Sequence, residues 1–174
     1  MAYAAQDASG AWQINIAPID GSQEPRVHAQ GEGPVWGPTG LLAWTGCASD
    51  GNCGILVDNP DDDQPPTRLT ASINDIGLSW APNGELLAYM SNVTGNWEVY
   101  LLSISGGVVV LTDDPASDGL PAWAPDGSGL AFVSNRDGVW GLYLMGPNGE
   151  DPRKILTLGP SLPNWTVQRL SWAP

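Results

Sequence analysis

The side chains most suited to chemistry in this sequence are the carboxylates of two acidic segments, residues 58–63 and 113–118. Asp113, Asp114 and Asp118 could together offer oxygen ligands to calcium, which binds about six to eight oxygens in proteins. Neither segment has the spaced ligands of an EF-hand loop, and Asp and Asn are also common in solvated turns. We therefore favour a turn role for both segments and expect no cofactor, with calcium as the one candidate ion.

Catalysis by the chain itself is not predicted. A nucleophilic hydrolase needs a histidine beside a nucleophile and an orienting third group, and the sequence has one histidine, His28. His28 takes the place that threonine holds in three later segments of similar sequence, on an expected outer strand. Asp113 and Asp114 would point to opposite faces of a strand, and no phosphate-binding glycine loop or metal-ligand spacing is present. We expect a surface structural role for His28 and no enzyme activity.

Two cysteines flank a short polar turn, residues 48–52. If the flanking segments pair as antiparallel strands, Cys47 and Cys53 can face each other with Cα atoms about 5.5 Å apart, within disulfide range. The alternative is two unpaired small apolar side chains. We favour the disulfide, which implies an oxidising compartment. A zinc site is not expected, because two cysteines and a distant histidine do not make a ligand set.

A short motif of Trp, a small residue and Pro occurs four times in the sequence. It indicates the secondary structure that would position the residues above. A spacing of roughly 45 residues indicates a repeat protein in which one supersecondary unit is copied and stacked. Proline followed by Asn or Asp and then Gly favours a tight turn, and the tryptophan supplies apolar surface between neighbouring sheets. We interpret the four tryptophans as structural. The copies are residues 35–40, 79–84, 122–127 and 171–174, with Trp36, Trp80, Trp123 and Trp172.

Three alternating apolar runs follow each complete copy of the phrase, separated by Gly, Pro, Asn and Asp. Such runs predict strands joined by tight turns, and no segment has the apolar period of a helix. The sequence therefore predicts one all-β domain, residues 1–174, built from four-stranded antiparallel sheets. The N-terminus supplies only the second to fourth strands, so one sheet is split between the chain ends. The expected units are 1–34, 35–78, 79–121 and 122–170, with 171–174 in the first strand of the split sheet.

The repeats resemble those of TolB-type β-propellers, and they are also similar to the propeller blades of prolyl-oligopeptidase-like enzymes. Thr39 and Cys53 depart from the pattern, since Asp or Asn and Trp are usual at these positions. The resemblance implies a β-propeller in which each sheet is one blade, giving four blade-equivalents per chain. It rests on Trp123–Gly127, Leu130–Phe132, Ser134–Gly138 and Leu142–Met145, and on their counterparts in the other units.

The resemblance also implies where a binding surface would lie. Asp75 and Asp118 each precede a first-strand tryptophan by the same number of residues. In a TolB-like ring, this position lies at the rim of the central channel, where ligands or ions gather. The longest link, residues 159–168, contains Trp165, an aromatic residue in a polar loop and hence a candidate contact residue. The alternative for Trp165 is packing over the end of a blade.

The function that the resemblance implies is a non-catalytic binding or scaffold module with a protein or peptide partner. Self-association through the split blade is also expected. We favour two chains in an eight-bladed ring, since TolB-type rings have more than four blades; a four-bladed monomer and an open filament are alternatives. A further alternative is the propeller of a peptidase or of a TolB-like periplasmic protein.

Charge and hydropathy narrow the partners and the location. The formal net charge is -13, with 6 Lys and Arg, which argues against nucleic acid and anionic membrane surfaces as partners. No apolar run approaches the ~18 residues of a membrane span, so membrane insertion is not expected. The first residues lack the basic and apolar regions of a signal peptide. We expect a periplasmic or extracellular protein.

Overall fold

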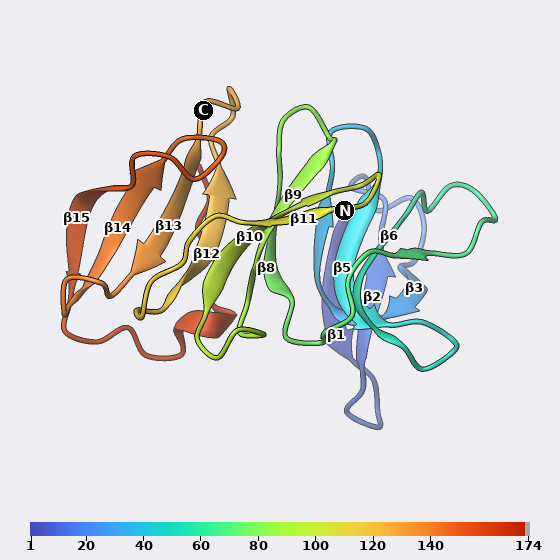
Figure 1. Cartoon of the computed structure of the whole chain (residues 1–174). Coiled ribbons are helices and arrows are strands. Elements are labelled where there is room, and N and C mark those ends of the chain that lie inside the picture. The colour runs from blue at the N-terminus through green and yellow to red at the C-terminus, as the bar shows by residue number, and fades with distance from the viewer. Residues whose placement is uncertain (173–174) are drawn as a thin grey trace. The chain divides into compact units, whose positions relative to one another are not determined.

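The structure is a computed structural model that describes residues 1–172. It is all-β, as predicted, and the one helical element among these residues is a short 3-10 turn, η1 (Trp165–Val167). The strands group into two compact units, Met1–Ile73 and a second unit that begins at Asn74. Within each unit the strands form antiparallel sheets (Figure 1). No helix in residues 1–172 is long and apolar enough to cross a membrane.

The first unit contains two sheets. Three strands, β1 to β3, form one sheet in chain order, and β4 to β7 form a four-stranded sheet, also in chain order. The three-stranded sheet lacks the first strand of the repeat, as the N-terminal alignment predicts. The strands are β1 (Ala2–Gln6), β2 (Trp12–Ile16), β3 (Arg26–Gln30), β4 (Glu32–Trp36), β5 (Leu42–Cys47), β6 (Cys53–Asp58) and β7 (Thr67–Arg68).

The second unit contains two complete four-stranded sheets, β8 to β11 and β12 to β15. Each is an up-and-down meander in which every strand pairs with its neighbour in the chain. The predicted four-stranded antiparallel blades are therefore confirmed. The strands are β8 (Ile76–Trp80), β9 (Leu86–Ser91), β10 (Glu98–Ser103), β11 (Val108–Val110), β12 (Asp118–Trp123), β13 (Leu130–Ser134), β14 (Trp140–Met145) and β15 (Arg153–Gly159).

The repeated Pro-containing phrase forms the tight turn between the first two strands of a sheet. The N–H of Gly84 donates to the carbonyl of Ala81 at 2.9 Å. The N–H of Gly127 makes the same bond to the carbonyl of Ala124, also at 2.9 Å. Both glycines have a positive φ, 72° and 74°, which glycine adopts without the steric cost of a Cβ atom. The turn predicted from Pro, Asn or Asp, and Gly is thus the turn observed.

The first strand of each complete sheet begins earlier than predicted. In all three, the register shifts by a β-bulge between the start of the strand and the tryptophan phrase. A bulge breaks the two-residue alternation on which the predicted boundaries rest, so the strand continues beyond the point where its sequence pattern stops. The strands start at Glu32, Ile76 and Asp118, not at the expected boundaries 35, 79 and 122.

The bulge has the same backbone form in each of these strands. Gly33, Gly77 and Leu120 stand at equivalent positions and have φ of 65°, 68° and 52°. A β-carbon is unfavourable at positive φ, so Leu120 carries backbone strain that the two glycines avoid. Its side chain is buried against Met90 and Trp140, and this packing stabilises the strained conformation.

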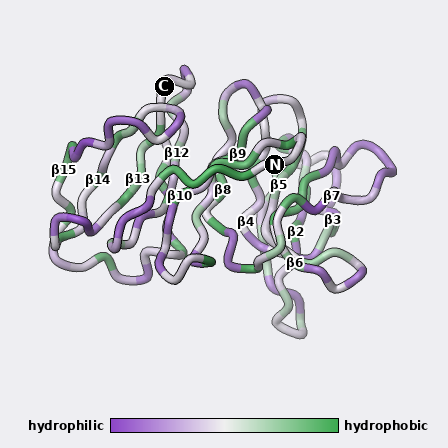
Figure 2. Tube along the Cα trace, viewed as in Figure 1, coloured by the Kyte–Doolittle hydropathy of each residue, from purple (hydrophilic) through white to green (hydrophobic). Residues whose placement is uncertain are grey.

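The core of each unit lies between its two sheets. In the first unit, Ile14 of β2 packs with Leu42, Trp44 and Leu56 of the following sheet, and all four are buried. In the second unit the corresponding cluster contains both sheets and includes Trp123. The turns are largely hydrophilic, as in the acidic segment that precedes β7 (Figure 2).

Candidate protein-binding surface

The two aspartates predicted at the rim are buried at the start of a first strand. Asp75 directly precedes β8, and Asp118 is the first residue of β12 and is 0% exposed. The bulge extends the first strand back to Asp118 in one sheet and to the residue after Asp75 in the other. A binding role for these two carboxylates stays a prediction.

Asp118 pairs with Arg136, a residue that sequence reasoning missed. The Arg136 Nη2 atom donates to Asp118 Oδ2 at 2.7 Å and lies 3.2 Å from Asp114 Oδ2. Arg136 Nε donates to the Ser134 hydroxyl at 2.9 Å. One guanidinium therefore holds two carboxylates, one on β12 and one in the preceding link. Sequence reasoning had no signal for this pairing, because Arg136 lies in the turn after β13 and only the fold brings it to the link.

The environment of this pair is apolar and aromatic. The Arg136 guanidinium lies over the rings of Phe132 and Tyr143, 5.2 Å from each ring centroid, a geometry that favours a cation. Burial raises the pKa of Asp118, and the Ser134 hydroxyl and Arg136 only partly offset this effect. The second Asp118 oxygen, Oδ1, is buried without a hydrogen bond of good geometry, which adds to the cost of holding a charge there.

A second buried carboxylate, Glu98 of β10, anchors the link between the two sheets of the second unit. The Thr112 hydroxyl donates to Glu98 Oε2 at 2.6 Å, and Asn96 Nδ2 donates to Oε1 at 2.6 Å. Asn96 Nδ2 also reaches the carbonyls of Asp114 and Ala116, at 2.8 and 2.5 Å. Burial raises the pKa of Glu98; the Thr112 and Asn96 hydrogen bonds lower it, and the nearby aspartates raise it further.

Glu98 had a recognisable signal in the sequence. It occupies a strand position where the neighbouring units have Gly54 and Gly141, so a charged residue replaces a small one in an otherwise apolar run. A charged residue is seldom buried without a partner. The substitution therefore indicates a local polar network, although not which residues complete it.

Calcium ligation was the candidate chemistry for Asp113, Asp114 and Asp118. Asp113 is exposed, while Asp114 and Asp118 are paired with Arg136. In residues 1–172, no group of three or more His, Cys, Asp or Glu side chains is placed to hold a metal ion. The guanidinium thus occupies the position beside these carboxylates that a cation would take.

Trp165 packs over the end of a blade instead of standing free in its loop. Its ring lies 5.9 Å from the ring of Trp97, in an edge contact, and 5.0 Å from that of Trp140. It also packs against the cluster that contains Met90 and Leu120. The candidate contact residue is thus half-buried, and the packing alternative is the one observed.

His28 is paired within the first unit, which corrects its expected surface role. Its Nε2 atom lies 2.9 Å from Asp58 Oδ2, and its ring meets Trp44 edge-on with centroids 5.6 Å apart. The cause is the stacking of the two sheets, which brings β3 over β6. Burial raises the pKa of Asp58, and the neighbouring His28 acts in the opposite direction. The histidine thus bonds to a carboxylate, and this contact places no nucleophilic hydroxyl beside it.

Cys47 and Cys53 form a disulfide across the β5–β6 hairpin. They face each other directly in the strand register, as the symmetric spacing about the turn predicts. Their Cα atoms are 3.8 Å apart, closer than expected. The reason is that the next pair, Ala48 and Asn52, forms the hydrogen bond, which makes the cysteines a non-hydrogen-bonded pair, the closer of the two kinds.

One face of the β12–β15 sheet is not covered by another sheet of its unit. Phe132 and Tyr143 point into the core shared with β8–β11. Ala131, Leu142 and Leu144 alternate with them and line a hollow of about 220 Å³ beside Leu170 and Trp172 on the opposite side. This face is apolar, and the described residues of the C-terminal segment that lie beside it are Leu170, Ser171 and Trp172.

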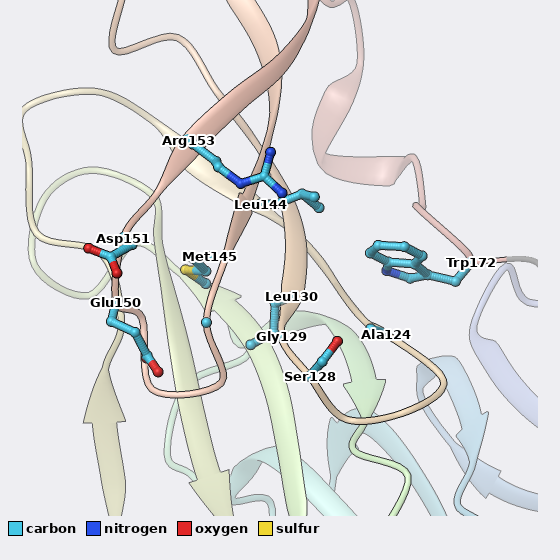
Figure 3. A pocket seen from close by; sticks show the side chains of 11 residues that line it. Ala124, Ser128, Gly129, Leu130, Leu144, Met145, Glu150, Asp151, Arg153 and Trp172 are labelled. Atoms are coloured by element: carbon cyan, nitrogen blue, oxygen red, sulfur yellow. The ribbon is translucent and has the colours of Figure 1, made fainter.

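A second hollow, of about 280 Å³, lies beside the first at the end of the sheet. Trp172 borders it on one side, and Glu150 and Asp151 border it on the other (Figure 3). The Trp172 Nε1 atom donates to the carbonyl of Ala122 at 2.9 Å, which fixes the indole against β12. Trp172 is not in a strand, and the rest of the predicted closing strand, residues 173–174, lies outside the described residues.

The four repeat tryptophans differ in burial. Trp80 and Trp123 are 9% and 7% exposed, whereas Trp36 and Trp172 are 42% and 39% exposed. Trp123 packs between the two sheets of the second unit, as predicted, and Trp80 is buried as well. The two outer copies leave their indoles partly open to solvent.

Comparison with known proteins agrees with this architecture. A family model described as the TolB beta propeller domain matches residues 1–169. No curated protein gave a significant sequence match. A protein assigned as TolB from Agrobacterium tumefaciens has a similar structure, with a TM-score of 0.76 and 22% identity, over 91% of this chain and 61% of that one.

Two further solved structures are similar at lower identity. TolB from Acinetobacter baumannii matches with a TM-score of 0.73 and 21% identity, over 88% of this chain and 40% of that one. A puromycin-hydrolyzing peptidase from Mycobacterium tuberculosis matches with a TM-score of 0.64 and 15% identity, over 88% and 29% of the two chains. The chain thus spans 61% and 40% of the two TolB structures. With its repeats, its antiparallel blades and the match over residues 1–169, the chain belongs to the TolB β-propeller domain family.

Proposed function

We propose that this chain is a non-catalytic β-propeller module that works by binding another protein or a peptide. The observation that carries the proposal is the apolar face of β12–β15, lined by Ala131, Leu142 and Leu144. Equivalent positions of the preceding sheet, such as Val99 and Leu101, are buried beneath the next sheet. A face with this composition is stabilised when a polypeptide covers it, because apolar burial is favourable in proportion to area.

The chemistry of the hollows fits a polypeptide better than a small polar substrate. The hollow beside Leu144 is lined mainly by apolar side chains, and an indole, that of Trp172, stands at its border. Aromatic residues in such positions are common anchors of protein interfaces. The charged side chains Glu150, Asp151 and Arg153 lie at the end of the sheet, where they can form a polar rim.

The absence of catalysis is part of this proposal. His28 is held by Asp58, and the buried carboxylates Asp118 and Glu98 are bonded to Arg136, Thr112 and Asn96. Some structures with this fold are hydrolases, among them the puromycin-hydrolyzing peptidase. A second candidate function is therefore the propeller part of a larger protein, a peptidase or a TolB-like periplasmic protein, which the partial coverage of those chains favours.

We also propose an extracytoplasmic location, periplasmic or extracellular. The support is the Cys47–Cys53 disulfide, because structural disulfides persist in oxidising compartments. Alkylation of free thiols in freshly lysed cells, followed by mass spectrometry, tests it: the two cysteines should be unmodified. Their complete alkylation would contradict the proposed location.

A peptide selection tests the binding function. Random displayed peptides are selected on the wild-type chain and counter-selected on Leu144→Asp, which places a charge on the apolar face. We expect enriched peptides that bind the wild type and not the variant, with Val109→Asp on β11 as an exposed control that keeps binding. A panel of ester, lactone and peptide substrates should give no turnover. Turnover that is abolished by His28→Ala, or enriched peptides that ignore Leu144→Asp, would overturn the proposal.

A further inference from the structure

The last strand of each sheet has one edge that pairs with no other strand in residues 1–172. These last strands are β3, β7, β11 and β15. An unpaired edge presents a row of backbone N–H and C=O groups to which another polypeptide can add as a strand. Folded proteins protect such edges with charged side chains, prolines, β-bulges or very short strands. The four strands differ in how far they use these protections.

Three of the last strands carry such protection. Arg26 begins β3, and the register between β3 and β2 is shifted. β7 has two residues, one of which is Arg68. Arg153 and Lys154 begin β15, and two register shifts interrupt its pairing with β14. Each of these edges therefore has a positive charge and is either irregular or short.

The remaining last strand, β11, has no charge and no irregularity. Its three residues are all valine, and its register with β10 has no shift. Residues 103–112 contain no charged residue and no proline. The side chains of Val108, Val109 and Val110 are 48%, 58% and 48% exposed, and the strand is hydrophobic throughout (Figure 2). Among the last strands in the described residues, β11 therefore has the one uncharged and regular edge.

The pairing of β11 with β10 extends beyond the three valines at both ends. The N–H of Ser103 donates to the carbonyl of Gly107 at 3.0 Å. The N–H of Leu111 donates to the carbonyl of Val99 at 2.8 Å. The segment from Gly107 to Leu111 is therefore held in extended form along β10.

These two hydrogen bonds also show which backbone groups of β11 point away from β10. Hydrogen bonding alternates from residue to residue along an antiparallel strand. Because Gly107 and Leu111 bond to β10, Val109 between them faces β10 as well. The N–H and C=O groups of Val108 and Val110 are directed to the open edge. The edge thus offers two donors and two acceptors at the spacing of a strand.

The chemical partner of such an edge is the backbone of another extended chain. Strand addition to an open sheet edge obtains affinity from main-chain hydrogen bonds and selectivity from the alternating side chains. The exposed valines add apolar contact, which favours β-branched residues in the incoming strand. Antiparallel addition continues the pattern of this sheet and is the slightly more stable kind of pairing.

Charge favours a different protein over a second copy of this chain. The formal net charge is -13, so two copies repel each other. Asp113 is exposed and follows β11 by three residues. A basic residue at the N-terminal end of an antiparallel incoming strand would lie beside this carboxylate.

We propose that β11 binds an extended segment of another protein by strand addition. The incoming strand is antiparallel to β11, has β-branched residues opposite the valines and has Lys or Arg beside Asp113. This edge belongs to the β8–β11 sheet, whereas the proposed function rests on the apolar face of β12–β15. The inference therefore adds a second binding surface and goes beyond that function.

A peptide selection with a backbone variant tests the proposal. Random displayed peptides are selected on the wild-type chain and counter-selected on Val110→Pro. Proline removes an outward N–H and leaves the hydrogen bonds to β10 in place, and it is tolerated on edge strands. Val110→Thr keeps both the N–H and the branched shape and is the matched control.

We expect enriched peptides that bind the wild type and Val110→Thr with similar affinity. They should bind Val110→Pro at least about tenfold more weakly, through a lost hydrogen bond and the bulk of the ring. Asp113→Asn should weaken binding by about two- to fivefold, as expected for an exposed charge pair. Peptides that bind Val110→Pro as well as the wild type, or the absence of any enriched peptide, would overturn the proposal.

Hydrogen exchange of the wild-type chain measures the same contact without a substitution. In the free chain, the amides of Val108 and Val110 should exchange faster than that of Val109, which bonds to β10. A saturating selected peptide should slow exchange at Val108 and Val110 by at least about tenfold. A peptide that binds and leaves both amides unchanged occupies another surface, which would contradict strand addition at β11.

The outcomes separate this inference from the proposed function. Counter-selection on Leu144→Asp removes peptides that bind at β11, so that experiment reports on the apolar face alone. Leu144-dependent peptides without any Val110-dependent peptides would overturn this inference and retain the proposed function. A wild-type chain that sediments at about twice 18.3 kDa, with Val110→Pro at 18.3 kDa, would show that β11 pairs with a second copy and would overturn the proposed partner.

Discussion

The two sheet pairs of this protein use the same repeat positions and differ in completeness. In the second unit, β12–β15 packs on a preceding sheet that has all four strands, and its Trp123 is 7% exposed. In the first unit, β4–β7 packs on a sheet of three strands, and its Trp36 is 42% exposed. The phrase around each tryptophan is nearly the same. The burial of a repeat residue therefore depends on the neighbouring sheet and not on its own sequence.

The two junctions also differ in their polar contacts. The second unit holds its link with Arg136, Asp118 and Glu98 in a buried network. The first unit has the His28–Asp58 pair between its sheets and a disulfide in its β5–β6 hairpin. Both arrangements add polar or covalent links to strands and turns that otherwise interact through apolar packing.

Truncation of the two tryptophans gives the largest expected contrast. Trp123→Ala should lower the free energy of unfolding by about 3–5 kcal/mol, because it leaves a cavity between sheets. Trp36→Ala should cost less than about 1 kcal/mol in the monomer, because its indole is partly solvated. Urea unfolding at low protein concentration measures both. Equal losses would show that the two junctions are equally complete.

Removal of Arg136 should have the next largest effect. Arg136→Met leaves Asp118 buried without its cation, and we expect a loss of about 2–3 kcal/mol in the free energy of unfolding. The double variant Arg136→Met/Asp118→Asn removes the uncompensated charge and should recover most of that loss. Chemical denaturation of the three proteins forms the comparison. A double variant as unstable as the single one would show that packing of Arg136 on Phe132 and Tyr143 matters more than the ion pair.

Removal of the disulfide of the first unit should have a smaller effect on the free energy of unfolding. Cys47→Ser/Cys53→Ser should lower stability by about 2 kcal/mol, the entropy expected for a loop this short. Hydrogen exchange should accelerate in the β5–β6 hairpin and stay unchanged in the β9–β10 and β13–β14 hairpins. Uniform acceleration in all three hairpins would contradict a local role for the disulfide.

The smallest expected effect is the pH dependence of the second unit. Burial raises the pKa of Glu98 above its ordinary value of 4.5, so the folded state holds this proton more tightly than the unfolded chain does. Stability from this group is therefore present at low pH and is lost as pH rises from about 4.5 through the raised pKa. Glu98→Gln should fall less in stability between acid and neutral pH than the wild type.

Asp126, an exposed residue, provides a control in which the pKa is shifted in the opposite direction. Hydrogen bonds from Ser128 lower the pKa of Asp126, so its contribution is present above the ordinary carboxyl pKa and is lost on acidification. Asp126→Asn should therefore reduce the loss of stability at low pH and leave the neutral range unchanged. Identical pH profiles for Glu98→Gln and the wild type would show that Glu98 is not perturbed by its burial.

The sequence predicted those features that depend on neighbours along the chain. The period of the tryptophan motif predicted the blades, and the Pro and Gly residues predicted the turns. The spacing of Cys47 and Cys53 about their turn predicted the disulfide. The alternation of side chains predicted the strands, except where a bulge interrupts it ahead of Val35, Ser79 and Ala122. These are local rules of backbone geometry, and one strand or one hairpin is enough to apply them.

Only the tertiary structure decided which of the repeated residues is buried and which polar groups meet. Asp118 is buried at the start of β12, Trp165 packs on Trp97 and Trp140, and Arg136 reaches Asp118 from the turn after β13. Burial and pairing arise from surfaces that come together across sheets, where residues far apart in sequence share one environment. The repeat therefore determines the strands and turns of each blade, while the neighbouring blade determines which of its residues are buried and which polar groups pair.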